Sequence, residues 1–179
     1  MKEIVQEGAE VLREVAKPVP EEVFGTPELA KMIKDMEVAL DPEKEGVALA
    51  APQIGLPYRI FIVRMDRVLP PSGDASQDKP LEPINDAYIN PEIVKTSRKR
   101  AHLDEGCLSV RGVYGTTLRH ERVTLRARSI DGKKFERGAG GLLAQIFEHE
   151  TDHLNGILFI DHADHLVEIT HGRTDKSDT

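Results

Sequence analysis

Hydrophobic residues recur at helical spacing in one segment of each half of the chain. The first stripe consists of Leu29, Met32, Ile33, Met36 and Leu40. Thr26 is a favoured N-cap, Pro27 suits the first helical position, and Asp41-Pro42 ends the segment. This pattern predicts a packing helix without chemistry of its own. A second apolar segment, residues 142–154, predicts another helix that Asn155-Gly156 closes.

Short β-prone runs separated by turn residues fill most of the remaining chain. They cover residues 58–63, 87–89, 93–97, 113–118, 123–130 and 133–137. Asp131-Gly132 is a strong hairpin signal. Residues 64–83 contain four prolines and predict a surface loop, and residues 138–141 predict a break before the second helix. The predicted fold class is α+β, with mainly antiparallel β-sheets packed around the helix of the C-terminal half and a packing helix in the N-terminal half.

Length and charge narrow the class of protein. The 179 residues favour one domain over residues 1–170, and the polar end, residues 171–179, is expected to be flexible. Lys and Arg total 24 against 31 Asp and Glu, and the net charge of −7 argues against DNA as a partner. No apolar run approaches the roughly 18 residues that span a bilayer, so no membrane partner is expected. The start lacks a cleavable hydrophobic segment, which favours a cytoplasmic protein.

The sequence His149-Glu150-Thr151-Asp152-His153 lies inside the second predicted helix and matches the pattern H-E-x-x-H. Histidines four residues apart share one face of a helix and can bind one metal ion. Glu150 projects close enough to handle the proton of a metal-bound water. A catalytic site normally takes three protein ligands, so a third must come from elsewhere.

The sequence offers two kinds of candidate for the third metal ligand, one downstream and one upstream of the motif. Downstream, His162, His165 and Glu168 lie at no recognised spacing, because the extended zinc-protease pattern fails at Phe159. Upstream, Cys107 is the only cysteine and follows a glycine between predicted strands. Such a thiol is most often a buried small residue, although a thiolate with two histidines suits zinc or ferrous iron.

Three segments together resemble the signature motifs of the peptide deformylases. They are residues 46–55, residues 105–109 (Glu-Gly-Cys-Leu-Ser) and residues 149–156, in the family's order and spacing, and the resemblance covers nearly the whole chain. It implies a metal-dependent hydrolase that removes the formyl group from the N-terminal formyl-methionine of newly synthesised proteins and releases formate. The expected partners are therefore N-formylmethionyl nascent peptides. The expected compartment is a bacterial-type cytoplasm, with an organellar stroma or matrix as the alternative.

The resemblance also assigns roles to the metal motif. Cys107, His149 and His153 resemble the family's metal ligands, and Glu150 resembles its general acid/base, with a metal-bound water as nucleophile. One divalent ion is expected, with Fe(II) as the native ion and Zn, Ni or Co as substitutes.

The same resemblance predicts how the substrate is held. Gln53 and the backbone N–H of Leu108 resemble the donors that stabilise the formyl oxygen as it becomes an oxyanion. The peptide is expected to pair with the backbone near residues 47–49 while its methionine enters an apolar wall. The predicted substrate-binding residues are Gly46, Val47, Ala48, Leu49, Leu142 and Ile146. Gly46 either permits close approach of the backbone or simply ends a loop.

Three residues are expected to support the ligands. Glu105 is predicted to orient a ligand histidine, with a surface carboxylate as the alternative. Asp152 resembles the family's structural acid and is expected to pair with Arg119, although a solvated helix face would give the same pattern.

Several positions depart from the family's usual pattern. Ala48 stands in place of a glycine, Arg111 in place of a proline, and Tyr114 in place of an arginine. The acidic tail lacks the long basic helix with which some bacterial members contact the ribosome, so ribosome contact is expected to be transient and made without it. Two other functions stay open: an H-E-x-x-H endopeptidase using a ligand such as Glu168, and a deformylase-like binding protein without activity.

Overall fold

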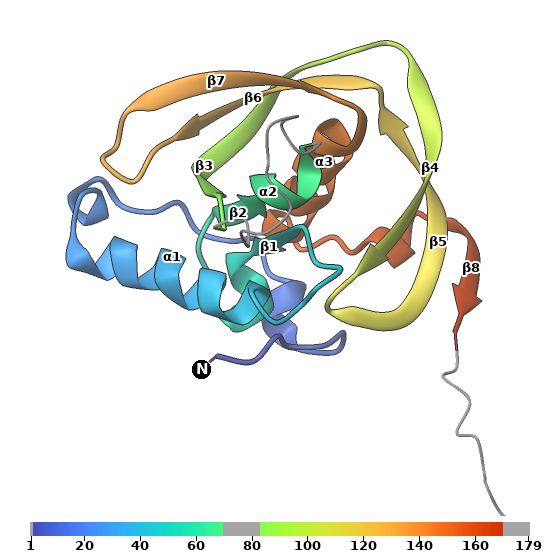
Figure 1. Cartoon of the computed structure of the whole chain (residues 1–179), viewed down its shortest axis with the longest axis horizontal. Helices are drawn as coiled ribbons and strands as arrows, with labels where there is room; N and C mark the ends of the chain where they lie inside the picture. Colours follow the sequence, from blue (N-terminus) through green and yellow to red (C-terminus); the bar gives the residue numbers. More distant parts are fainter. Residues whose placement is uncertain (1, 70–82, 170–179) are drawn as a thin grey trace, which may run out of the picture.

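Both predicted helices are present in the computed structural model, which describes residues 2–69 and 83–169 (Figure 1). Helix α1, Pro27–Leu40, begins as expected at Thr26, whose Oγ1 accepts a hydrogen bond from the Leu29 N–H. Helix α3, Gly141–Leu154, carries the H-E-x-x-H motif and ends at Asn155. Of the helices in the described ranges, none has the length and apolar character needed to cross a membrane.

Two antiparallel sheets form the rest of the scaffold. The larger has the strand order β1-β2-β3-β6-β7, and the smaller has the order β4-β5-β8. The strands of the larger sheet are β1 (Ala48–Ala50), β2 (Ile60–Arg64), β3 (Asn85–Thr96), β6 (Arg122–Arg128) and β7 (Lys134–Gly140). Those of the smaller sheet are β4 (Arg100–Cys107), β5 (Val110–His120) and β8 (Asp164–Glu168).

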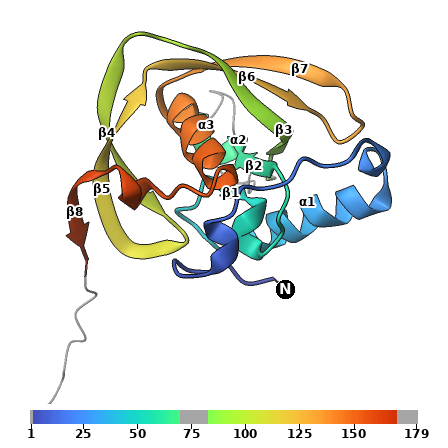
Figure 2. The same cartoon turned by 180° about the vertical axis from the view of Figure 1, so that it is seen from behind.

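Helix α3 is the central element, enclosed by the strands in both views (Figures 1 and 2). The period-2 alternation of β2 explains how the larger sheet is covered on both faces. Phe61 and Val63 belong to the apolar cluster shared with α3, whereas Ile60 and Ile62 belong to the cluster shared with α1. The predicted α+β architecture, with antiparallel sheets around the C-terminal-half helix, is therefore confirmed.

Three strands were not among the runs predicted from the sequence, namely β1, β4 and β8. Strand β4 contains Arg100, Asp104 and Glu105, and the inward-facing Glu105 is buried because Arg119 of β5 pairs with it. Strand β8 is exposed along its whole length and is held by antiparallel pairing with β5. In β4 the alternation of apolar and polar residues is limited to Ala101 and Leu103, and β8 shows none.

Other boundaries were also wrong. The predicted loop at residues 64–83 begins instead with the buried end of β2 at Arg64 and a short helix, α2 (Met65–Val68). Strand β3, Asn85–Thr96, is one strand with bulges where two, at residues 87–89 and 93–97, were expected. The expected break at residues 138–141 is mostly the end of β7, where glycines still pair with β6. The predictions for residues 70–82 and for the tail after residue 169 lie outside the described residues.

Candidate active site

Three potential metal ligands converge between α3 and the end of β4. The side-chain ligand atoms of Cys107, His149 and His153 all lie within 4.8 Å of one another. The Sγ of Cys107 is 3.3 Å from Nε2 of His153. The two imidazole rings lie edge to face on neighbouring turns of α3, with centroids 4.9 Å apart. This donor set, one thiolate and two imidazoles, fits a zinc or ferrous ion and leaves room for a further ligand.

The downstream candidates lie elsewhere. His162 is 3.3 Å from Asp152, and His165 and Glu168 belong to the exposed strand β8. Among the described residues, the close group contains Cys107 and none of these three.

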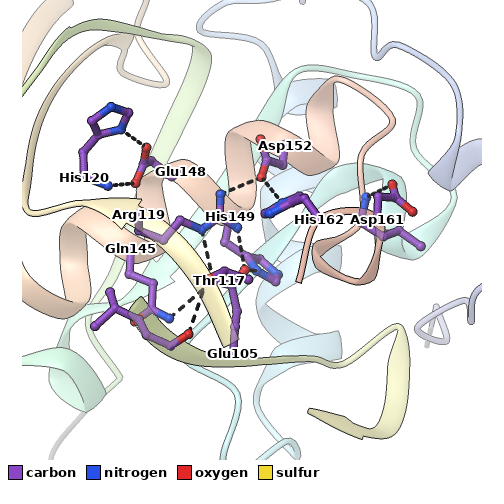
Figure 3. A network of polar contacts seen from close by, with 12 residues as sticks. Glu105, Thr117, Arg119, His120, Gln145, Glu148, His149, Asp152, Asp161 and His162 are labelled. Carbon is purple, nitrogen blue, oxygen red and sulfur yellow. Dashed lines mark hydrogen bonds and ion pairs between the residues drawn. The ribbon is translucent and has the colours of Figure 1, made fainter. Parts of the chain in front are cut away.

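Glu105 fixes the orientation of the first histidine. Its Oε1 lies 2.5 Å from Nδ1 of His149, which leaves the Nε2 atom of that ring directed toward the ligand group (Figure 3). Thr117 of β5 donates a hydrogen bond to the same carboxylate at 2.7 Å. Arg119, also on β5, donates two hydrogen bonds to it, at 2.5 and 3.1 Å. Burial favours a raised pKa for Glu105, but the hydrogen bonds from His149 and Arg119 outweigh it and lower the pKa.

Arg119 links the carboxylate that holds His149 to Asp152, which is three residues further along α3 and on the same side of the helix. Its guanidinium joins Glu105 to Asp152, whose Oδ2 accepts a hydrogen bond at 2.7 Å and also lies beside His162 (Figure 3). The side chain of Arg119 is only 5% exposed. The ion pair expected between Asp152 and Arg119 is therefore present, and it ties α3 to the smaller sheet.

Glu150 is a buried carboxylate of a different kind. It is 4% exposed, and its Oε2 has no hydrogen-bond partner among the described residues. Burial raises the pKa of Glu150 to about 7. Such a group, beside two imidazoles, is suited to exchanging a proton with a molecule bound at the site. This unpartnered oxygen, together with the donor set, fits a bound metal and water.

The histidines differ in their electrostatic surroundings. Burial lowers the pKa of His149, but hydrogen bonds to Cys107 and Glu105 outweigh it and raise the pKa well above its usual value. Burial and the neighbouring His149 lower the pKa of His153 well below its usual value. The neutral form of His153 is the form that can bind a metal.

Gln53 is held with its amide nitrogen toward the cysteine. Its Oε1 accepts a hydrogen bond from the Ala50 N–H at 2.9 Å, which assigns the orientation of the amide. Its Nε2 donates to Ser109 Oγ at 3.1 Å and lies 3.6 Å from Cys107 Sγ. Leu108 follows Cys107 directly, and its carbonyl accepts a hydrogen bond from Gln6 at 3.0 Å. The side chain of Gln53 therefore faces the ligand group in a fixed orientation.

A cleft of about 1110 Å³ leads to this group. The predicted wall residues Gly46, Val47, Ala48, Leu142 and Ile146 all line it. Leu49 was expected beside the substrate, but its side chain is fully buried in the cluster under α1, so only its backbone is available. The alternation of β1 explains this, because successive side chains point to opposite faces.

Gly46 lies at a point of close approach. A Cβ at this position would lie 2.9 Å from Leu40 Cδ1 and 3.0 Å from Leu108 Cδ1. Glycine therefore lets the loop before β1 lie against the turn after Cys107 without displacing these leucine side chains.

Sequence reasoning missed several contributors. Thr117 and Gln145 both contact the Glu105 carboxylate, and Ile169, just after β8, lines the cleft. An ion pair between Glu43 and Arg111 was not predicted either. Each depends on pairing between segments far apart in the chain, for which the sequence carries no local signal.

Comparison with known proteins agrees with this arrangement. The family model described as polypeptide deformylase matches residues 1–168. A peptide deformylase of Hydrogenovibrio crunogenus is 44% identical over 153 residues, which cover 86% of this chain and 80% of that protein. The crystal structure of a peptide deformylase from Legionella pneumophila has a TM-score of 0.75 at 37% identity, covering 90% of this chain and 85% of that one.

A solved structure with a bound peptide is also similar. The Met-Ala-Ser bound class I type b peptide deformylase from Acinetobacter baumannii has a TM-score of 0.74 at 30% identity and covers 89% of this chain and 97% of that one. The family model matches nearly all of the sequence, and the relatives share 30–44% of their residues with it over most of the chain. These two findings together decide the family. The chain belongs to the polypeptide deformylase family and is an enzyme of that family.

Proposed function

We propose that this enzyme hydrolyses the N-formyl group of formyl-methionyl peptides, using one divalent metal ion held by Cys107, His149 and His153. The observation that carries the proposal is the convergence of these three ligand atoms beside a cleft lined by Cys107, His149 and Glu150, with the Glu150 Oε2 atom unpartnered among the described residues. The proposed compartment is the one in which ribosomes begin chains with formyl-methionine.

The metal supplies the part of the chemistry that these side chains cannot. A divalent ion, when bound, lowers the pKa of water and polarises the formyl carbonyl. The thiolate and imidazole donors suit Fe(II), which we propose as the native ion, with Zn, Ni or Co able to substitute.

The protein side chains then divide the remaining work. Gln53, fixed by its bond to Ala50, and the backbone N–H of Leu108 donate to the formyl oxygen as negative charge develops on it. Glu150 accepts a proton from the attacking water and delivers it to the departing amine. The new carbon–oxygen bond forms first and places the negative charge on the formyl oxygen. The carbon–nitrogen bond then breaks as the amine takes the proton, and the products are formate and a free amino terminus.

The substrate peptide is proposed to extend the larger sheet. Among the strands that the structure describes, β1 pairs with β2 alone, so its other edge can accept an extended peptide. The methionine side chain would enter the apolar wall formed by Val47, Leu142 and Ile146. The likeness to a relative with bound Met-Ala-Ser supports a methionyl peptide as the ligand.

The test is anaerobic purification with metal analysis, followed by turnover of formyl-Met-Ala-Ser. We expect one metal ion per chain and release of formate. Cys107→Ser should bind metal markedly more weakly, and unchanged metal content in this variant would contradict the ligand assignment. A metal-loaded wild type that leaves the formyl peptide intact would contradict the proposed function.

A further inference from the structure

An ion pair joins the two walls of the cleft. Arg111 of β5 donates from Nη1 and Nη2 to the two carboxylate oxygens of Glu43, at 3.1 and 2.7 Å. Both residues line the cleft, although they are 68 positions apart in the sequence. The side chain of Arg111 is 51% exposed and that of Glu43 is 25% exposed. This bidentate pair, hereafter the cleft clasp, is accessible to solvent and to whatever enters the cleft.

The clasp lies where the far part of a bound peptide would pass. Strand β1 runs toward the 3₁₀ turn that carries Gln53, while the chain before it leads back through Gly46 to Glu43. A peptide on the free edge of β1, with its formyl group near Gln53 and Cys107, extends past Ala48 and then Gly46. At roughly 3.3 Å per residue of extended chain, its third residue comes beside Gly46. The Gly46 N–H is bonded to the Glu43 carbonyl at 2.9 Å, so this residue of the peptide lies on the clasp side of the cleft.

The two partners are held with different firmness. Arg67 donates to the backbone carbonyls of Glu43 and Gly46 at 2.7 and 2.6 Å. These two hydrogen bonds hold the backbone of the loop that carries Glu43. Within the described ranges, the Arg111 side chain has hydrogen bonds to Glu43 and to no other residue. A guanidinium has five N–H donors, and the clasp uses one on each of two nitrogens. Arg111 therefore keeps donors for a second carboxylate.

The rest of this region is poor in positive charge. Lys44 is the only other Lys or Arg residue among those that line the cleft, whereas Glu43, Glu45 and Asp104 are acidic. A substrate carboxylate here meets repulsion unless Arg111 binds it. The pair itself perturbs both groups: the hydrogen bond from Arg111 lowers the pKa of Glu43, and the bond to Glu43 raises that of Arg111.

We propose that Arg111 recognises an acidic side chain at the third residue of the formyl peptide, and that Glu43 competes with this side chain for the same guanidinium. The inference rests on the proposed function and adds a substrate preference to it. Glu43 thus sets how strongly the enzyme distinguishes acidic from neutral peptides.

The test compares two peptides that differ in one charge. Formyl-Met-Ala-Glu-Ser and formyl-Met-Ala-Gln-Ser, both amidated at the C-terminus, are assayed for kcat/KM at low ionic strength. Glu43→Gln should raise the Glu/Gln ratio about five-fold, the upper range for an exposed ion pair. Arg111→Gln should lower the ratio below that of wild type, and the double variant should behave like Arg111→Gln. Added salt should reduce these differences.

Two control variants separate recognition from general electrostatics. Lys44→Gln removes a cation of the same loop, and Glu136→Gln removes one partner of an exposed ion pair with Arg126 that does not line the cleft. We expect the second to leave the ratio unchanged and the first to lower it less than Arg111→Gln does. If Lys44→Gln lowers it equally, the effect is long-range charge and the proposal is overturned. An equal ratio in wild type and all variants overturns it as well.

Failure of this inference and failure of the proposed function give different results in this assay. If wild type turns over neither peptide, the proposed function fails. If both peptides are hydrolysed and Glu43→Gln changes both by the same factor, the clasp only supports the cleft wall and this inference fails. Should Glu43→Gln not fold, the ratio in Arg111→Gln alone decides, because loss of recognition must still lower it.

Discussion

Two networks of charged residues meet the cleft, and they differ in burial. Behind the ligand group, Arg119 and Glu105 have side chains 5% and 4% exposed, and several further hydrogen bonds satisfy them. At the mouth, Arg111 and Glu43 form a similar bidentate pair, but both are open to solvent. The same kind of arginine–glutamate ion pair therefore occurs once in a buried, less polar environment and once in contact with water.

Burial decides what each pair can do. A buried charge must keep its partner, because separation leaves an uncompensated ion in a medium of low polarity. The buried network is thus suited to holding His149 in one orientation. An exposed pair gives little stability, since water competes for both partners. The clasp is therefore free to exchange one carboxylate for another, as substrate recognition requires.

The largest effect is expected at Glu150, which is as buried as Glu105 but has no cation bonded to it. Glu150→Gln should retain metal and fold while kcat falls by about a thousand-fold or more, the scale of general acid–base catalysis. Formate release by metal-loaded enzyme measures this loss. Near-normal turnover at matched metal content would remove Glu150 from the mechanism.

The second prediction breaks the buried network. Arg119→Met leaves the carboxylates of Glu105 and Asp152 without their cation, and the free energy of unfolding should fall by about 3–5 kcal/mol. Urea unfolding at matched metal content measures the change. Arg126→Met, at an exposed pair with Glu136, is the matched control and should change stability by no more than about 0.5 kcal/mol. Equal losses in both variants would contradict the role of burial.

The third prediction concerns the orientation of the ligand. Glu105→Gln keeps an oxygen that can accept from His149 but removes the negative charge, so metal affinity should fall about 10- to 100-fold. Competition with a chelator measures the affinity. Asp104→Asn, the neighbour on β4 with an exposed side chain, serves as control. A loss of the same size in the control would show that general charge, and not orientation, matters.

These networks also explain what the sequence could predict. The metal motif and both helices have strong local signals, namely histidines four apart and apolar residues at helical spacing. Glu105 and Arg119 could be proposed only as members of a family pattern, because their pairing depends on the register between β4 and β5. Strand β8 and the clasp have no local signal, since exposed strands lack alternation and exposed charges look alike in any sequence.

A smaller effect is expected at Ala48, on the apolar side of the same cleft. Ala48 stands where the family usually has glycine, and its methyl group is 8% exposed within the cluster around α3. If the methyl group limits how closely a peptide approaches β1, Ala48→Gly should tighten binding of a hydroxamate by up to about 1 kcal/mol. The same change should cost about 0.5–1 kcal/mol in stability. Equal affinity at matched metal content would show that the methyl group is neutral.

The smallest effect on stability is expected for the clasp itself. A double-mutant cycle with Glu43→Gln and Arg111→Gln isolates the coupling between the two side chains. Because both are accessible to water, we expect a coupling free energy of about 0.5 kcal/mol in urea unfolding. The equivalent cycle with Glu105→Gln and Arg119→Met should give a coupling several times larger. If the clasp contributed as much as the buried pair, it would be too firmly closed for a substrate carboxylate to displace Glu43. A weak coupling is therefore a condition for Arg111 to act in recognition.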